Sequence, residues 1–222
     1  MIDDIDDIMV LLDEISSTID GYTDIYVIGG GAMMFMGSKE YTKDLDLVAA
    51  TVEDYRSIRD ALLSIGFVSD RPSYGMERAN LSDTLTREDY RVDLFDRVIC
   101  GHLQLSDSMR QRSHKRYQSE NLTLYSCASE DIFLLKSITE REGDVADCNN
   151  LIRGSISFDW TVFIGELNVQ MSFGNPVWIT YVMERMLRMN IEKRHPEVFE
   201  KVSSMEEKYL HQWASSFERI DG

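Results

Sequence analysis

Residues 27–48 read VIGGGAMMFMGSKEYTKDLDLV, a pattern that predicts a buried strand, a glycine turn opening a helix, and a second apolar strand carrying Asp44 and Asp46. Side chains two apart in a strand project to the same face, so these two carboxylates should point together. Two anions side by side on a core strand repel each other and lose solvation unless a cation lies between them. A divalent metal ion is the simplest such cation.

Composition favours a packed globular chain. Of the 222 residues, 43% are hydrophobic and only 3 are proline, which suits one domain or one domain with a helical extension. The formal net charge of −16 argues against broad nonspecific binding to nucleic acid or anionic lipid, because both are polyanions.

Several features point to the cytoplasm and away from a membrane. No apolar run approaches the roughly 20 residues needed to cross a bilayer, and the acidic start, MIDDIDDIM, is unlike a presequence. The three cysteines form no CxxC pair, which favours reduced thiols over a disulfide or zinc framework; they are Cys100, Cys127 and Cys148.

Hydrophobic periodicity predicts an α+β fold with a purely helical end. The predicted strands cover 24–29, 44–49, 90–98 and 121–126, with another at 67–68 and one within 71–90. The predicted helices cover 2–19, the turn through 36, 53–64, 106–117, 130–140, 143–153, 159–172, 177–190 and 197–217. We therefore expect an α/β core at 1–128 and a helical region at 129–222, packed on that core.

A third acid lies in the strand predicted at 90–98. Asp93 sits between Val92 and Leu94 and should face opposite to them. An aspartate in an apolar strand is usually paired or ligates something. Beside residues 44–48 it would join Asp44 and Asp46 in an oxygen-rich site that suits Mg²⁺ or Mn²⁺. Two alternatives remain open: a salt bridge from Asp93 to Arg91 or Arg97, and Asp96 as the inward acid.

Together these motifs resemble a known family. The paired glycines, residues 31–43 and then DLD are similar to the signature of the nucleotidyltransferase fold related to DNA polymerase β. The positions of Gly37 and Thr42 look most like the minimal nucleotidyltransferases and AbiEii-type toxins. The resemblance resumes at SEDIFLLKSITEREGDVADCNNLI, residues 129–152. It implies a mixed β-sheet flanked by helices and followed by a helical C-terminal region.

The resemblance also implies roles for individual residues. Gly29, Gly30 and Gly31, with Thr42, would lie against the triphosphate, and Asp44, Asp46 and Asp93 would hold the metal ions. Asp93 would also position or deprotonate the acceptor hydroxyl. Lys136 would neutralise phosphate charge, with Asp144 or Asp147 supporting it. Where close relatives often have a basic pair after the glycine matching Gly37, this chain has Ser38-Lys39.

Simpler readings of the same residues stay open. Glycine is common in tight turns for steric reasons alone. Lys136 could extend along an apolar face to solvent, and Asp144 and Asp147 could only favour the start of a helix. The basic run within 110–116 could guide a nucleotide or RNA, or form a charged helix surface paired with nearby acids.

Two functional hypotheses follow. The first is a Mg²⁺-dependent nucleotidyltransferase that moves a nucleoside monophosphate from a nucleoside triphosphate to an acceptor hydroxyl. The acceptor is left open between a transfer RNA end, a protein and a small molecule, and a toxin role with a cognate antitoxin is consistent with the resemblance. The second is a nucleotidyltransferase-fold protein that has lost catalysis and serves as a binding or regulatory partner.

Overall fold

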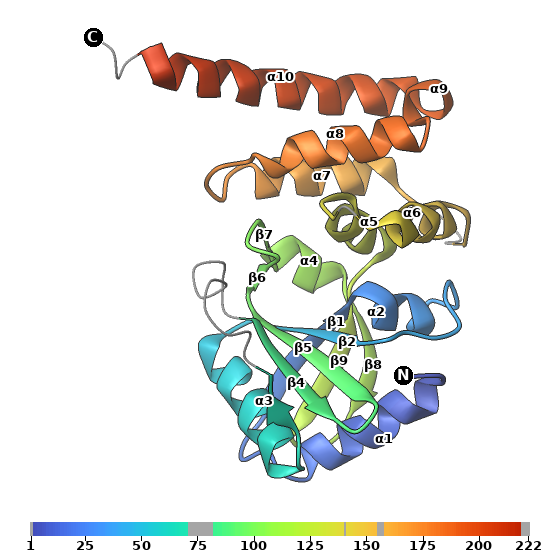
Figure 1. Ribbon diagram of the computed structural model, residues 1–222, viewed down its shortest axis with the longest axis vertical. Helices are drawn as coiled ribbons and strands as arrows, with labels where there is room; N and C mark the ends of the chain where they lie inside the picture. The colour runs from blue at the N-terminus through green and yellow to red at the C-terminus, as the bar shows by residue number, and fades with distance from the viewer. Residues whose placement is uncertain (1, 71–81, 140, 155–157, 219–222) are drawn as a thin grey trace.

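The computed structural model describes residues 2–70, 82–139, 141–154 and 158–218. A mixed sheet occupies one end of the molecule, and helices from Ser129 onward stack on the other end (Figure 1). The predicted fold class, a mixed sheet flanked by helices and followed by a helical region, is confirmed.

The large sheet has the strand order β3-β4-β5-β2-β1-β9-β8. The central strands β1 and β2 are antiparallel, and each pairs in parallel with its outer neighbour, β9 and β5 respectively. The strands are β1 (Thr23–Ile28), β2 (Leu45–Ala49), β3 (Val68–Ser69), β4 (Ser82–Arg87), β5 (Tyr90–Asp96), β8 (His114–Gln118) and β9 (Leu122–Ser126). A separate two-stranded hairpin joins β6 (Val98–Ile99) to β7 (Leu103–Gln104).

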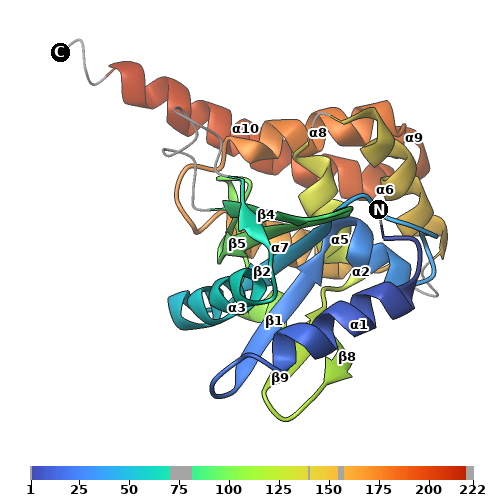
Figure 2. The same ribbon diagram turned by 60° about the horizontal axis from the view of Figure 1, so that its bottom comes forward.

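Two helices at the amino end pack beside the sheet (Figure 2). Helix α1 (Ile5–Ser16) begins at Asp4, whose side chain accepts a hydrogen bond from the Asp6 amide. Helix α3 (Val52–Ser64) is capped by Thr51, whose side chain accepts a hydrogen bond from the Asp54 amide. The helix contacts β1, β2 and β5. The short helix α2 (Gly29–Phe35) follows β1 directly, and α4 (Asp107–Arg112) follows the small hairpin.

The remaining helices form successive layers above the sheet (Figure 1). Helix α5 contacts α2 of the core as well as α6, α7 and α8. Helix α10 packs on α7, α8 and α9. Their bounds are α5 (Ser129–Ser137), α6 (Glu142–Gly154), α7 (Trp160–Gln170), α8 (Trp178–Arg188), α9 (Ile191–Arg194) and α10 (Pro196–Glu218). No described helix combines the length and apolar character needed to span a membrane.

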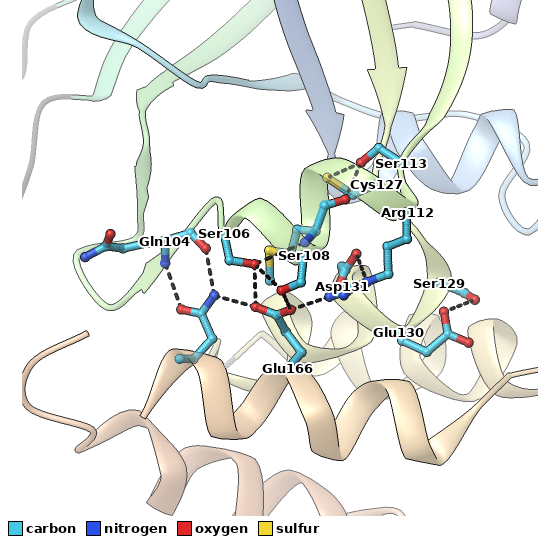
Figure 3. Close-up of polar contacts among 12 residues, drawn as sticks. Gln104, Ser106, Ser108, Arg112, Ser113, Cys127, Ser129, Glu130, Asp131 and Glu166 are labelled. Carbon is cyan, nitrogen blue, oxygen red and sulfur yellow. Dashed lines mark hydrogen bonds and ion pairs between the residues drawn. The ribbon is translucent and has the colours of Figure 1, made fainter. Parts of the chain in front are cut away.

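A buried polar cluster ties this helical region to the core (Figure 3). The Arg112 guanidinium of α4 donates to Asp131 of α5, with Nε 3.0 Å from Oδ2, and to Glu166 of α7, with Nη2 2.5 Å from Oε2. Ser106 and Ser108 both donate to Glu166 at 2.7 Å. One arginine therefore joins three helices that are far apart in the sequence.

The sequence prediction was wrong in one segment. Residues 106–117 were predicted as one helix, but α4 ends at Arg112 and His114–Gln118 form the edge strand β8. The short hairpin β6–β7 and helix α9 were also not predicted. A strand was predicted within 71–90; β4 lies there, whereas 71–81 lie outside the described residues.

Candidate functional site

Two of the three predicted acids are direct neighbours in the sheet. Asp46 of β2 pairs in register with Asp93 of β5. Leu45 and Leu47 flank Asp46 on the opposite face and are fully buried. Asp44 immediately precedes β2, two residues from Asp46. The alternation of β2 and its pairing with β5 thus bring the acids together on one face of the sheet.

The glycine turn lies against Asp46. Gly29 has φ +60°, and a Cβ built on it would be 2.1 Å from Asp46 Oδ2. A Cβ on Gly30 would be 2.2 Å from Thr42 Oγ1. A Cβ on Gly31 would be 2.8 Å from a Leu45 methyl group, so Gly31 is required by the core. Each of the three glycines is therefore required because a side chain would clash with a neighbour. At Gly29, the missing side chain lets the backbone approach the Asp46 carboxylate.

The three acids repel one another, and Asp46 is the acid whose pKa shows this most clearly. Burial, followed by the charges of Asp44 and Asp93, raises the pKa of Asp46 to about 7. Lys136 and Arg141 act in the opposite direction but do not offset that rise. Among the described residues, no hydrogen bond or ion pair reaches the carboxylates of Asp44 and Asp46. Within the described part of the chain, Asp44 and Asp46 therefore have no directly paired cation.

Asp93 is already paired. It accepts hydrogen bonds from Thr84 Oγ1 at 2.8 Å and from Arg91 Nη2 at 3.0 Å. The alternative of a salt bridge to Arg91 is therefore confirmed; Arg97 instead donates to the Ala50 carbonyl. The register alternative, Asp96, pairs with Ala49 rather than with Asp46.

The donor types suit a divalent cation, although the side chains are not arranged as a finished metal site. Carboxylate oxygens are the ligands that Mg²⁺ and Mn²⁺ prefer, and the raised pKa of Asp46 indicates that its ionised form has no partner that stabilises it. Within the described residues, no three His, Cys, Asp or Glu side chains are grouped so that they could hold a metal ion. A cation bound by all three acids would therefore require Asp93 to turn from Arg91.

Lys136 belongs to a chain of buried charges beside the acids. Its Nζ lies 2.8 Å from Asp144 Oδ1 and 2.7 Å from Asp147 Oδ2. Asp147 Oδ2 also accepts from Lys39 Nζ at 2.9 Å. Burial alone would raise the pKa of Asp147, but hydrogen bonds from the two lysines outweigh burial and hold it below its ordinary value.

The alternative that Lys136 extends along an apolar face to solvent is therefore wrong, since only 12% of its side chain is exposed. Asp144 is buried and lies in the first turn of α6. Asp147 lies one turn further along α6, where it joins two lysines, so its contacts go beyond favouring a helix start.

Thr42 is placed differently from the other predicted site residues. It is buried, and its hydroxyl donates to the Asp44 carbonyl at 3.0 Å while packing against Gly30. Its backbone pairs with Ile2 in both directions. The structure thus gives Thr42 a part in holding the loop before β2, and a direct contact of Thr42 with nucleotide remains a prediction.

Four residues near the acids were not assigned to the site from sequence. Lys39 passes over Gly30, with its Cδ 3.8 Å from a Cβ built there, and Arg91 holds Asp93. Arg141 and Cys100 are within electrostatic range of Asp46. Lys39 lies two residues after Gly37, where the family resemblance places a basic pair. The resemblance therefore offered a signal that Lys39 could belong to the site.

The basic run within 110–116 is divided between two elements. Arg110 donates to the Tyr26 hydroxyl at 3.4 Å, and Arg112 is bound by Asp131 and Glu166. His114 and Lys115 are exposed on β8. Pairing with nearby acids therefore holds for Arg110, which lies 3.3 Å from Asp107, and for Arg112, although the other three basic residues of the run lie in a strand rather than a helix.

Comparisons with known proteins give a likeness at the level of structure. No family model and no curated protein sequence matches the chain. A solved structure named "putative nucleotidyltransferase from H. pylori" matches over 93% of this chain and 95% of that chain, with a TM-score of 0.40 and 10% sequence identity.

Proposed function

We propose that the chain is a metal-dependent nucleotidyltransferase that moves a nucleoside monophosphate from a nucleoside triphosphate to an acceptor hydroxyl. The single observation that carries the proposal is the pairing of Asp46 with Asp93 beside Asp44, against the Gly29 turn. Three neighbouring carboxylates, of which only Asp93 is paired with a cation, lie next to a glycine turn and are suited to binding divalent metal ions.

Asp44, Asp46 and Asp93 would hold Mg²⁺ or Mn²⁺, and Asp93 would exchange Arg91 for the metal. Bound divalent ions would activate the attacking oxygen and stabilise the pyrophosphate leaving group. The partly buried position of Asp46 limits competing water. Gly29 and Gly30 carry no side chain, and this lets Asp46 and Thr42 lie directly against the start of α2.

Lys39 and Lys136 would supply positive charge on the phosphate side. Both already share Asp147, which fixes their ammonium groups relative to each other and to α6. A fixed cation stabilises developing charge without reorganising during the reaction. The arrangement supports catalysis by orientation and charge stabilisation, with no covalent nucleophile.

The test is incubation of the protein with each labelled nucleoside triphosphate, Mg²⁺ and cell extract. The wild type should transfer label, and the Asp44→Asn/Asp46→Asn double variant should not, because neutral amides bind Mg²⁺ poorly. Asp20→Asn, at an exposed position before β1, is the matched control and should retain activity. Full transfer by the double variant would rule out this mechanism.

The same labelling identifies the acceptor, for which the candidates are a transfer RNA end, a protein side chain and a small molecule. A toxin role in the cytoplasm, controlled by an antitoxin, is a further part of this proposal. It predicts that expression of the wild type, but not of the double variant, arrests growth of the host cell.

One observation favours the second candidate, a nucleotidyltransferase-fold binding protein without catalysis. Asp93 is held by Arg91 and Thr84, which leaves two unpaired acids rather than three. Calorimetry with ATP, GTP, CTP and UTP in Mg²⁺ separates the candidates. Metal-dependent triphosphate binding supports the enzyme, and its absence supports the binding protein.

A further inference from the structure

A polar pocket of about 260 Å³ lies between the end of α5 and one face of α8. None of its lining residues belongs to the acid cluster. The lining residues are Ser137, Thr139, Tyr181, Glu184, Arg185 and Arg188.

Arg185 is a buried cation with incomplete hydrogen bonding. Its side chain belongs to a residue that is 2% exposed, and Nη2 donates to the Thr139 carbonyl at 2.5 Å. Its Nη1 is buried and has no hydrogen-bond partner. Among the described residues, no carboxylate lies within 4.0 Å of this guanidinium. A buried guanidinium without an anion is unfavourable, so Arg185 is better satisfied when an anion binds.

The geometry of α8 supplies a second cation on the same face. Tyr181, Arg185 and Arg188 follow one another at helical spacings of four and three, and all line the pocket. Arg188 is exposed, so it can move toward a ligand. Glu184 also lines the pocket and is exposed, so it can turn to solvent.

The hydroxyl groups of Ser137 and Thr139 at this pocket already have hydrogen-bond partners. The Ser137 hydroxyl donates to the Phe133 carbonyl at 2.7 Å, and the Thr139 hydroxyl is bound to the Lys136 carbonyl and to Asp144. Recognition in this pocket therefore falls to the guanidinium groups of Arg185 and Arg188, beside Tyr181. Their planar fork suits the paired oxygens of a phosphate group.

The pocket is linked to the acid cluster through named contacts. Thr139 contacts Asp144, which binds Lys136 of the charge chain. On the other side, the Tyr181 ring contacts His102, with ring centroids 6.0 Å apart. His102 lies two residues after Cys100, which is within electrostatic range of Asp46 and Asp93.

We propose that the pocket lined by Arg185 and Arg188 binds a phosphate group of a substrate. Phosphate binding by this pocket does not depend on the proposed nucleotidyl transfer. Only the statement that the phosphate belongs to a substrate rests on that proposed function. Two sources share this chemistry: the donor triphosphate, and a phosphate carried by the acceptor.

The experiment is calorimetric and thermal-shift titration with inorganic phosphate at constant ionic strength, in metal-free buffer. The wild type should bind phosphate saturably. Arg185→Met, which keeps an unbranched apolar side chain without the guanidinium, should weaken binding at least tenfold, and Arg188→Ala several-fold, because each removes a charge-assisted contact. Arg56→Ala, at an exposed position on α3, is the matched control and should bind as the wild type does.

Phosphate stabilisation of equal size in the wild type, Arg185→Met and Arg188→Ala would overturn the proposal, as would no binding by the wild type. If Arg185→Met does not fold, Arg185→Lys replaces it, and unchanged affinity in Arg185→Lys and Arg188→Ala together overturns the proposal. Asp44→Asn/Asp46→Asn should still bind phosphate, so the pocket can be confirmed even if nucleotidyl transfer fails. Titration in excess non-hydrolysable triphosphate assigns the source: loss of phosphate binding indicates the donor, and retention indicates the acceptor.

Discussion

The Arg91 guanidinium holds both carboxylate oxygens of Asp93, with Nε 3.1 Å from Oδ1 and Nη2 3.0 Å from Oδ2. Asp93 is the register partner of Asp46, so Arg91 neutralises one acid of a cluster that otherwise lacks a cation. Arg91 and a divalent ion would therefore compete for the same carboxylate.

Removing Arg91 should strengthen metal binding. In Arg91→Ala, Asp93 is freed from the guanidinium, and we expect the Mg²⁺ affinity measured by calorimetry to rise several-fold. Because half of the Arg91 side chain is exposed, the free energy of unfolding should change by no more than about 1 kcal/mol. Arg56→Ala is the control. Weaker Mg²⁺ binding by Arg91→Ala would show that the arginine supports the metal site rather than competing with it.

The Gly29 position should tolerate no side chain. Gly29→Ala places a Cβ at a position 2.1 Å from Asp46 Oδ2 and requires alanine at φ +60°. We expect displacement of the Asp46 carboxylate, loss of transfer activity, and destabilisation by about 1–2 kcal/mol. Activity and urea unfolding measured together test this.

A matched glycine provides the control for that variant. Gly165 is exposed in the middle of α7, and a Cβ there meets nothing within 4 Å. Gly165→Ala should stabilise the protein by about 0.5–1 kcal/mol and leave activity unchanged. If Gly29→Ala behaved like Gly165→Ala, the close approach to Asp46 would be of no importance.

Lys136 should be important for stability as well as for phosphate binding. Lys136→Met leaves Asp144 without its 2.8 Å partner and Asp147 with Lys39 alone. Because these carboxylates are largely buried, we expect a loss of about 3 kcal/mol in the free energy of unfolding. Lys201→Met, at an exposed position on α10, should have little effect. Equal stability of the two variants in urea unfolding would mean that the ion pairs of Lys136 make no net contribution to the free energy of unfolding.

The fold was predictable wherever side-chain periodicity reports burial. Leu45 and Leu47 alternate with the acids, and this alternation gave both the strand and the face of the acids. The segment 114–118 gave no such signal, because HKRYQ is polar and β8 is an edge strand with exposed side chains. An edge strand is specified by the backbone of its neighbour β9, which the local sequence does not reveal.

The candidate site was predictable in its acids but not in its cations. Asp93 could be placed beside Asp46 once two neighbouring strands were assumed. The contact of Lys39 with Asp147 joins residues 108 apart in the sequence, and no local pattern predicts it. Arg185 is similar: its burial depends on how α8 packs near the end of α5, which is a property of the tertiary structure.

The cluster that joins the core to the helices should make stability depend on pH. Asp131 and Glu166 share the single cation Arg112, and Glu130 lies nearby. Burial raises the pKa of Asp131 to about 6, although Arg112 acts in the opposite direction. The folded protein therefore binds this proton more tightly than the unfolded chain, whose aspartates titrate near the ordinary value of 3.8.

The contribution of Asp131 to the free energy of unfolding should be full below the unfolded pKa and lost as the pH rises through about 6. Asp131→Asn cannot titrate, so the wild type should lose up to about 3 kcal/mol relative to this variant between low and neutral pH. Urea unfolding of both proteins across this range measures the difference, and the exposed Asp107→Asn variant is the control. A wild type that instead gained stability relative to Asp131→Asn as the pH rose would show that Arg112 keeps Asp131 ionised in the folded protein.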